Sequence, residues 1–467
     1  MRVVLADLKG QNGVVSKDTI AGGYGSRFRG ISWTTRVVER MRKLYRNLPS
    51  IQLGYLAAIF AQAGHEVYVT DNKWIPGDLA LVLTSIVDFR HEIQWAEEAR
   101  RRYGMQVGFF GTFATHVPEV LAGHGDFIIK GEPEHAALRL AQGEILKGPV
   151  VSSTIQDLDS LPFPRWDLVY RRRFGHAVGH SLFSMRSVFP LLSSRSCPEF
   201  CTYCPHRITA VYRARSPQNV LEEIEQICRQ YGRVFLVFRD PLFTEERDRS
   251  MAIAEGIIRK NLPVRFECET RLDSLDKELI DLLYRAGLRA LTFGVESVDS
   301  NTLKRVGRRP IPPEHQKDII SYCSKKGIMT VGFYVIGFLT DTIESIQATI
   351  DYSIDLNSTM ALFKILTPYP GTPLRKRMES LITETDLEKF DGYTPTFKHP
   401  NLTHEQLLFM LTTAYSRFYI RPSWGWNYLG LPNCFAKWVQ RWDAYAQRRQ
   451  REIEMAYFTS QEPKAIS

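Results

Sequence analysis

The sequence contains no uninterrupted apolar run of 18 residues, so it predicts no membrane-spanning helix. Its first residues, MRVVLADLKGQNG, turn polar too soon for the apolar core of a signal peptide. Cysteine is scarce, with seven residues, an odd number, of which three lie in one short segment. This pattern does not indicate a disulfide framework. We therefore expect a cytoplasmic protein, with peripheral contact to a membrane as an open alternative.

The composition also lacks the extremes of a disordered or fibrous chain. The 467 residues are 44% hydrophobic and 24% charged, which is ordinary for a globular protein with two or three domains. A formal net charge of +9 permits an acidic partner such as RNA or an anionic membrane surface. Many bacterial enzymes are mildly basic as well, and we expect no nucleic-acid partner.

The segment SSRSCPEFCTYCPH, residues 193–206, carries the densest group of metal-ligand side chains. It sets Cys197, Cys201 and Cys204 in a CxxxCxxC run after a short apolar strand-like stretch. Thiolates this close converge on one site, and soft sulfur ligands select an iron–sulfur cluster, zinc or Cu(I). Three cysteines on a four-iron cluster leave one iron open to a reactant, whereas His206 would complete a Cys3His zinc site. The spacing favours the cluster, keeps zinc as an alternative and makes a disulfide a distant third.

Residues 1–147 predict a parallel, doubly wound α/β sheet with a basic insertion, residues 9–50, after its first strand. Apolar strand-like runs alternate with helical segments, at residues 2–8, 66–71, 79–85, 106–111 and 126–131. Ligands of such sheets lie beyond the carboxyl ends of the strands. The pattern predicts a small-molecule or nucleotide site there, or a flavodoxin-like scaffold without one. The strand ends carry small, polar, turn-forming residues, namely Thr84, Ser85, Gly111, Thr112, Gly131 and Glu132.

Residues 187–397 predict a second α/β domain, after a proline-containing linker at residues 148–186. Helical segments separate six strand-like runs, which begin near positions 187, 234, 264, 290, 329 and 361. This is the pattern of a partial (β/α)6 barrel, whose chemistry lies at the carboxyl ends of the strands. Helical spacing puts Cys228 and Cys323 on buried faces, where they serve as core residues rather than ligands.

The strand-like run VRFECETR, residues 264–271, alternates apolar and charged side chains. A barrel strand packs its apolar face against helices, so the charged face points into the barrel. Charges buried there must pair or bind a polar ligand. An edge strand with one solvated face is the alternative.

The CxxxCxxC run with Tyr203 before its last cysteine resembles the signature of the radical S-adenosylmethionine (SAM) enzymes. The resemblance extends to five later strand ends, FRDPLFT, CETRLD, FGVESVD, VGFYVIGF and TPYPGTPL. It implies that the open iron of a [4Fe-4S] cluster chelates SAM and that reduction releases a 5′-deoxyadenosyl radical.

The same resemblance implies roles for single residues around SAM. Tyr203 and Gly294 would line the adenosine side, and Glu296 would meet the amino group or the ribose. Arg271 would bind the carboxylate through two parallel hydrogen bonds. The GGE-like element of the family is not recognisable, and Asp240 is a loose stand-in for it.

The N-terminal region is similar to the cobalamin-binding domain that precedes many radical SAM domains, through IQLGYLAAIFAQAGHEVYVTD, FFGTFAT and DFIIKGEPE. The six strand-end residues given above would then contact cobalamin. Residues 7–13, DLKGQNG, lack the DxHxxG motif that supplies a histidine to the lower face of cobalt, and FGT replaces a GGP-like turn. A degenerate domain without cobalamin is the alternative.

Residues 398–467 predict a helical C-terminal region that is also similar to the tail of cobalamin-type radical SAM proteins. Within it, residues 424–451 are rich in tryptophan, tyrosine and arginine. This composition suits a membrane interface. A helix that packs on the barrel with a basic outer face is the alternative.

Together these features predict a cobalamin-dependent radical SAM enzyme, most simply a methyltransferase acting on an unactivated carbon of a secondary metabolite or lipid. A cyclase or rearrangement enzyme of the same type is the alternative, as is a non-catalytic Fe–S or zinc module. Methylthiolation would need a second cysteine triad, which the sequence lacks. The expected partners are a small-molecule or lipid substrate and an electron donor such as flavodoxin or ferredoxin.

Overall fold

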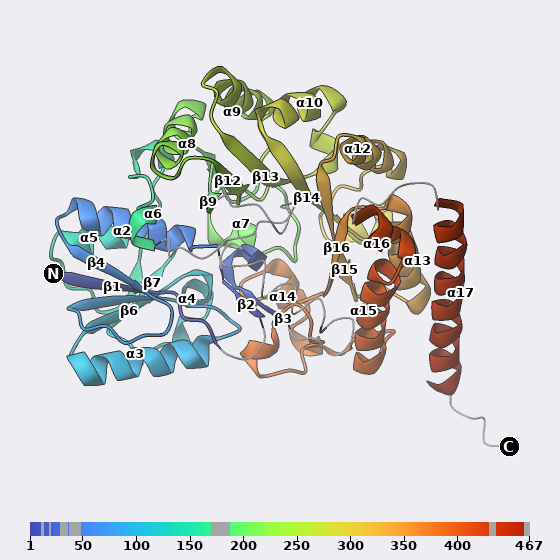
Figure 1. The fold of residues 1–467 in the computed structure, drawn as a ribbon. Helices are drawn as coiled ribbons and strands as arrows, with labels where there is room; N and C mark the ends of the chain where they lie inside the picture. The colour runs from blue at the N-terminus through green and yellow to red at the C-terminus, as the bar shows by residue number, and fades with distance from the viewer. Residues whose placement is uncertain are drawn as a thin grey trace.

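The computed structural model describes residues 1–10, 14–17, 20–28, 36, 48–169, 187–428 and 436–461. They form two six-stranded parallel sheets with flanking helices and a helical C-terminal region (Figure 1). The predicted α/β class with this arrangement is confirmed. Most of the basic insertion, residues 170–186 of the predicted linker and Cys434 lie outside the described residues.

The first sheet has the strand order of a flavodoxin-like domain, with one additional edge strand. Its order is β4 (Glu66–Thr70), β1 (Arg2–Ala6), β5 (Leu79–Leu83), β6 (Gln106–Phe110), β7 (Phe127–Lys130) and β8 (Gly148–Val151). The order reverses between β1 and β5, which makes that junction the switch point of the sheet. The five predicted strands are present, and β8 comes from residues that we assigned to the linker.

Helices cover both faces of this sheet, which explains why its central strands are apolar throughout. In β1, Val3 and Leu5 belong to one buried cluster and Val4 and Ala6 to another, because successive side chains alternate between faces. The first cluster includes residues of α2 (Ile51–Gln62) and α5 (Glu134–Ala141), and the second includes residues of α3 (Phe89–Tyr103). Figure 1 shows α3 on the side of the sheet opposite to α2 and α5.

The second sheet is the predicted six-stranded partial barrel. Its neighbouring strands are β9 (Ser187–Leu191), β12 (Val234–Phe238), β13 (Val264–Thr270), β14 (Leu288–Glu296), β15 (Met329–Ile336) and β16 (Met360–Ile365), all parallel. The connecting helices are α8 (Pro217–Tyr231), α9 (Arg247–Arg259), α10 (Lys277–Ala286), α12 (Pro313–Lys325) and α13 (Ile343–Leu356). Consecutive strands are neighbours in space, as right-handed βαβ connections produce.

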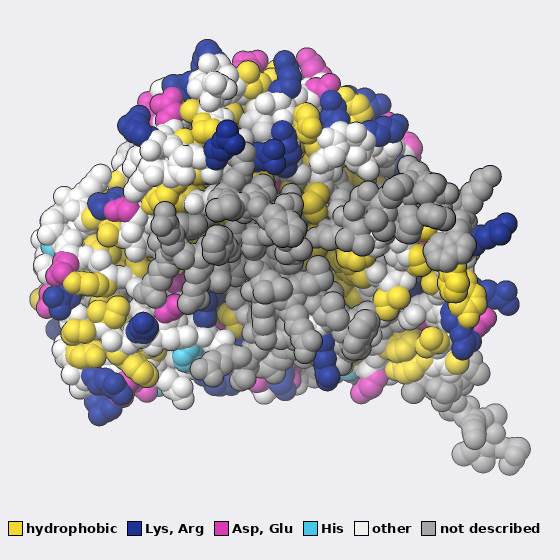
Figure 2. All heavy atoms as spheres, in the orientation of Figure 1, with side chains coloured by type: hydrophobic (Ala, Val, Ile, Leu, Met, Phe, Trp, Pro, Cys, Tyr) yellow, Lys and Arg dark blue, Asp and Glu magenta, His cyan; other side chains and the backbone are white. Residues whose placement is uncertain are grey.

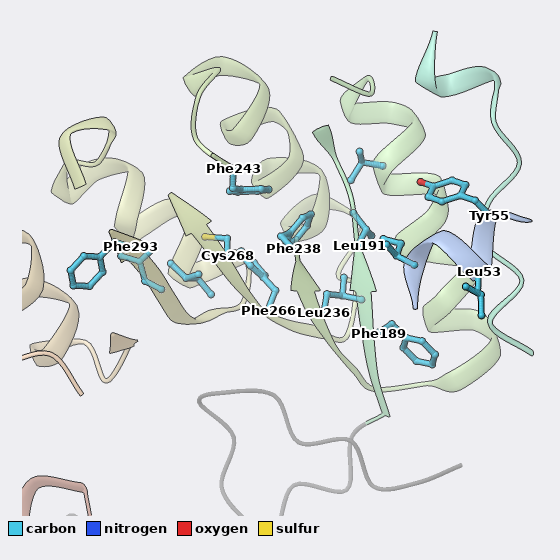
Figure 3. Close-up of a cluster of buried hydrophobic side chains, with 14 of the residues drawn as sticks. Leu53, Tyr55, Phe189, Leu191, Leu236, Phe238, Phe243, Phe266, Cys268 and Phe293 are labelled. Carbon is cyan, nitrogen blue, oxygen red and sulfur yellow. The ribbon is translucent and has the colours of Figure 1, made fainter. Parts of the chain in front are cut away.

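Strand β13 shows the predicted alternation. Phe266 and Cys268 are each 1% exposed and lie in the apolar core beside Phe238, so Cys268 is a core residue (Figure 3). On the other face Glu267 and Glu269 are half-buried. Burial raises the pKa of Glu269 to about 7, although Arg239 opposes this shift. The charged face is therefore inside the barrel, as expected, and only Arg265 near the start of the strand is exposed.

The described part of the basic insertion lies between the two sheets. It comprises β2 (Val14–Ser16), a 3-10 helix (Ile20–Gly23) and β3 (Ser26–Phe28), and Figure 1 shows β2 and β3 between the two halves of the molecule. Tyr24 is fully buried, and its backbone oxygen accepts a hydrogen bond from Ile86 of the first domain. Its hydroxyl donates to the Pro370 carbonyl of the second domain at 2.6 Å. The insertion thus connects the two domains.

The C-terminal helices pack on the open edge of the barrel. Helix α15 (His404–Tyr419) starts with a capping box at Thr403 and Gln406, and the Tyr415 hydroxyl bonds to the backbone of Phe363 in β16. Helices α16 (Pro422–Tyr428) and α17 (Ala436–Gln461) follow. Phe409 of α15 stacks on Tyr457 of α17, with ring centroids 3.8 Å apart. Among the described helices, none combines the length and the apolar character needed to cross a membrane.

Candidate active site at the carboxyl ends of the barrel strands

The three clustered cysteines lie in one loop between β10 (Ser194–Arg195) and the short helix α7 (His206–Thr209). Ser196 adopts a left-handed conformation with φ 65°, and its hydroxyl bonds to the backbone oxygens of His206 and Ala210. The backbone of Thr202 bonds to Val306 at 2.8 Å and to Leu374 at 3.0 Å. These bonds fix the loop to the barrel, so the positions of the cysteines are set by the fold.

The thiols of this loop are mutually close and poorly solvated. Burial raises the pKa of Cys197 to about 11, and it raises the pKa of Cys201 and Cys204 as well. Electrostatic repulsion from its two partners raises the pKa of Cys204 further. The site therefore disfavours free thiolates and gains from a bound cationic centre, which deprotonates coordinating thiols. Three convergent sulfur donors fit an iron–sulfur cluster.

The zinc alternative would need His206 as its fourth ligand. Among the described residues, no three His, Cys, Asp or Glu side chains are placed to share one metal ion. A structural zinc needs four ligands at bonding distance from a single ion, whereas a four-iron cluster is larger and takes more widely spaced ligands. Burial and the nearby charge of Arg239 lower the pKa of His206 to about 4, and both residues line a cavity between the domains.

Gly294 and Glu296, both predicted to contact SAM, lie together at the end of β14 near the cysteine loop. The register of β14 shifts between them, and Glu296 has φ 68°. A Cβ atom on Gly294 would lie 2.1 Å from Oε1 of Glu296, so a side chain there would displace this carboxylate. Burial raises the pKa of Tyr203, and the nearby carboxylate of Glu296 raises it further. The structure therefore brings these three residues together.

Arg308 was not predicted as a site residue. Its guanidinium lies 3.6 Å from the Glu296 carboxylate and 4.0 Å from Sγ of Cys201, and it donates to the Gly294 carbonyl. Its only sequence signal is a basic loop, VGRRP, a few residues after FGVESVD. Since loops with paired arginines are common on surfaces, this signal alone does not indicate a buried site.

Arg271 and Asp240 already have protein partners. Arg271 is 3% exposed and bonds to both carboxylate oxygens of Asp273, at 2.9 and 2.8 Å. Its Nη1 is buried without a hydrogen-bond partner and lies 3.9 Å from Glu199 in the cysteine loop. Asp240 is fully buried and accepts hydrogen bonds from Ser193 and Ser194. Arg271 thus keeps one donor for a ligand, whereas Asp240 anchors the start of the cysteine loop.

A cavity between the two domains contains four of the six strand-end residues. Gly111, Thr112, Gly131 and Glu132 line it from the first domain, and Arg195, His206 and Arg239 line it from the second. Gly22 and Gly23 of the insertion also contribute to its wall. All four glycines have positive φ angles. A Cβ atom on any of them would meet a neighbouring protein atom, so glycine is needed for the close packing of this wall. The cavity lies at the carboxyl ends of the strands, where such sheets bind their ligands.

Thr84 and Ser85 do not line this cavity. Both are fully buried, and their polar atoms bond within the first domain, to the Phe110 carbonyl and to the Glu92 carboxylate. The insertion covers this strand end, because a Cβ atom on Gly25 would lie 3.3 Å from Cβ of Ser85. The sequence placed these residues correctly at a strand end but could not reveal that the insertion occupies the space above them.

The comparisons with known proteins agree with this geometry. Residues 191–353 match the family described as the radical SAM superfamily. An uncharacterized methyltransferase of Pyrococcus horikoshii is 28% identical over 273 residues, which cover 57% of this chain and 58% of that protein. The anaerobic magnesium-protoporphyrin IX monomethyl ester cyclase of Cereibacter sphaeroides is 26% identical over 291 residues, or 61% of this chain and 46% of that protein. The chain thus spans about half the length of these curated relatives.

A solved structure has the same fold over nearly the whole chain. It is the radical SAM methyltransferase TsrM from Kitasatospora setae, with cobalamin and a [4Fe-4S] cluster bound. The TM-score is 0.64 at 16% identity, and the match covers 97% of this chain and 99% of that chain. Residues 191–353 are therefore similar to the radical SAM superfamily, and the whole chain has the two-domain fold of the TsrM structure.

Proposed function

We propose that the chain is an enzyme that cleaves SAM to a 5′-deoxyadenosyl radical for cobalamin-dependent methylation of an unactivated carbon in a secondary metabolite or lipid. The observation that carries this proposal is the placement of three poorly solvated thiols of one loop beside the Glu296–Arg308 pair at the carboxyl ends of the barrel strands. A glycine-lined cavity between the domains lies beside them. When bound, the [4Fe-4S] cluster and cobalamin would supply the electron and the methyl group.

The residues of the chain would hold and orient the reactants. Cys197, Cys201 and Cys204 would hold the cluster as its three thiolate ligands. The free Nη1 donor of Arg271 and the Glu296 carboxylate would bind the carboxylate and the amino group of SAM. Arg271 is 3% exposed and the Glu296 side chain 12% exposed, which would limit the access of water to a reactive radical.

Gly111, Thr112, Gly131 and Glu132 would hold cobalamin from the first domain, at the cavity between the domains. The carboxylate of Glu132 already pairs with Arg195 at 3.4 Å and with Arg213, so it holds the two domains together around the cavity. Residues 7–13 lack the DxHxxG motif and would supply no histidine ligand to cobalt.

A cyclase or rearrangement enzyme is the second candidate, favoured by the similarity to the protoporphyrin ester cyclase of Cereibacter sphaeroides. Both candidates would use the cluster, SAM and the 5′-deoxyadenosyl radical. They differ in the reaction that the substrate carbon undergoes afterwards, which is methylation in one and cyclisation or rearrangement in the other. For either one we propose a small-molecule or lipid substrate and a flavodoxin-like or ferredoxin-like electron donor.

The test is an anaerobic reconstitution of the full chain with iron, sulfide, cobalamin and SAM. We expect cluster absorbance, retained cobalamin, and 5′-deoxyadenosine after reduction. Cluster and SAM cleavage without cobalamin would contradict the methylation proposal and leave the radical chemistry. Stoichiometric zinc in place of iron would overturn the whole proposal.

Replacing Arg271 separates an enzyme from an Fe–S carrier. We expect R271Q to keep its cluster and to lose most 5′-deoxyadenosine formation, since the Nη1 donor proposed for the SAM carboxylate would be missing. The matched control is R265Q, because Arg265 is an exposed residue near the start of β13, the strand that ends directly before Arg271. Normal SAM cleavage by R271Q would show that this arginine does not bind SAM.

A further inference from the structure

Backbone contacts of Val306 and Gly307 hold the segment that carries Arg308 against the cysteine loop. Arg308 follows α11 (Ser300–Arg305) in the segment VGRRP. Gly307 has φ 75°, and a Cβ atom there would lie 2.6 Å from the backbone oxygen of Phe200. The amide of Thr202 donates to the Val306 carbonyl at 2.8 Å. The loop that carries Arg308 therefore packs directly on the CxxxCxxC segment.

The guanidinium of Arg308 connects two parts of the site. One amino group lies 4.0 Å from Sγ of Cys201, and the other bonds to the Gly294 carbonyl and lies 3.6 Å from Oε1 of Glu296. The side chains of Arg308 and Glu296 are only 11% and 12% exposed. Charges this poorly solvated interact over several ångströms with little screening.

We propose that Arg308 is a positioning residue that holds a positive charge beside the cluster ligand Cys201 and raises the reduction potential of the cluster, with Glu296 as the opposing charge. This inference rests on the proposed function, because it requires a cluster on the three cysteines. One electron added to the cluster makes it more negative, and a nearby cation stabilises that reduced form. Hydrogen bonds to the sulfurs and local charge are known determinants of cluster potentials.

The next residue in the chain provides a matched control. Arg309 carries the same charge, but its side chain is 70% exposed and pairs with Glu199 at 2.8 Å. Solvent and salt screen such a charge. If position rather than net charge matters, replacing Arg309 leaves the potential unchanged.

The experiment is a mediated redox titration of the reconstituted full chain at pH 8, without SAM or cobalamin, followed by electron paramagnetic resonance. Iron and sulfide are quantified for every variant. We expect R308Q to lower the ratio of reduced to oxidised cluster about tenfold at a given potential, a midpoint shift of about −59 mV for one electron. We expect E296Q to shift the midpoint in the opposite direction, and R309Q to match the wild type.

The opposite shifts distinguish a charge effect from a structural one, because a disturbed site would move both midpoints in the same direction. A fully loaded R308Q with the wild-type midpoint overturns the inference and leaves the proposed function intact. If R308Q loses iron, E296Q becomes the deciding variant. A midpoint of E296Q that is equal to or below that of the wild type then overturns the inference. A wild-type chain that binds no cluster overturns both the inference and the proposed function.

Discussion

At the scale of single residues, the three loop thiols have no substitute. We expect C197A, C201A and C204A each to lose nearly all bound iron and sulfide after reconstitution, because a cluster with three protein ligands has none to spare. C228A is the control, since Cys228 is a half-buried thiol on α8, in the helical face predicted from its spacing. A triad variant that still binds four irons per chain would contradict the assignment.

A second residue-scale prediction concerns Glu269 inside the barrel. Burial raises its pKa from about 4.5 to about 7, so the folded chain holds a proton that the unfolded chain releases between these values. Stability from this group is therefore present below pH 4.5 and is lost as the pH rises through 7. As the pH rises from 5 to 8, we expect the wild type to lose about 2 kcal/mol of unfolding free energy relative to E269Q. Thermal melts at several pH values measure it, and parallel curves for the two proteins would refute it.

The proximity of the three cysteines followed from their spacing, and the position of Gly294 and Glu296 at a strand end followed from the strand pattern of LTFGVE. Arg308 was not predicted, because its contact with Cys201 depends on a glycine turn that brings a distant loop onto the cysteine segment. The roles proposed for Arg271 and Glu296 toward SAM remain predictions.

At the scale of elements, the insertion after β1 is held by buried charges. Lys17 pairs with Glu92 at 2.7 Å, and both side chains are at most 3% exposed. Glu92 also accepts hydrogen bonds from the amide and the hydroxyl of Ser85. Removing one member of a buried pair leaves the other charge uncompensated.

We therefore expect K17M to destabilise the chain by about 3 kcal/mol in denaturant unfolding. The double variant K17M/E92Q, which also removes the negative charge, should recover part of this loss. K9M is the surface control, because Lys9 is 43% exposed and lies 3.9 Å from Asp7. An equal loss in the single and double variants would show that the lysine packs rather than pairs.

Regular elements followed from the sequence where periodicity was strong. The helix with Ser216, Pro217 and Gly232 at its ends and all six barrel strands are examples. Strand β8 was not predicted, because its four residues, Gly148–Val151, are followed by prolines and resemble a linker. Only their pairing with β7 identifies them as a strand. The insertion could not be placed either, since its contacts with Ile86 and Pro370 are long-range and leave no periodic signal.

At the scale of the whole molecule, the predicted aromatic and basic segment divides into two parts. Trp424 packs on the barrel, where its indole N–H donates to the Thr359 carbonyl at 2.8 Å. This supports the packed-helix interpretation for the start of the segment. On α17, Trp442 and Tyr445 are 47% and 57% exposed. Figure 2 shows lysine and arginine side chains beside hydrophobic ones at this edge of the molecule.

The membrane contact therefore stays a prediction, now confined to α17. Arg448, Arg449 and Arg451 are exposed near Trp442 and Tyr445, which is the combination that binds an anionic interface. We expect the full chain to co-sediment with vesicles containing anionic lipid and not with neutral ones. Added salt should weaken binding, because screening reduces the attraction of surface charges.

The variants W442S/Y445S and R448Q/R449Q/R451Q separate the two contributions on α17. Both should reduce the bound fraction severalfold, since each basic residue near an anionic surface contributes about 1 kcal/mol. Arg101 and Arg102 on α3 offer a control pair of exposed arginines in the first domain, away from α17 (Figure 1). If R101Q/R102Q weakens binding as much as the α17 variants do, the attraction comes from the net charge of +9 rather than from this helix. Binding that survives both α17 variants would place the contact elsewhere or exclude it.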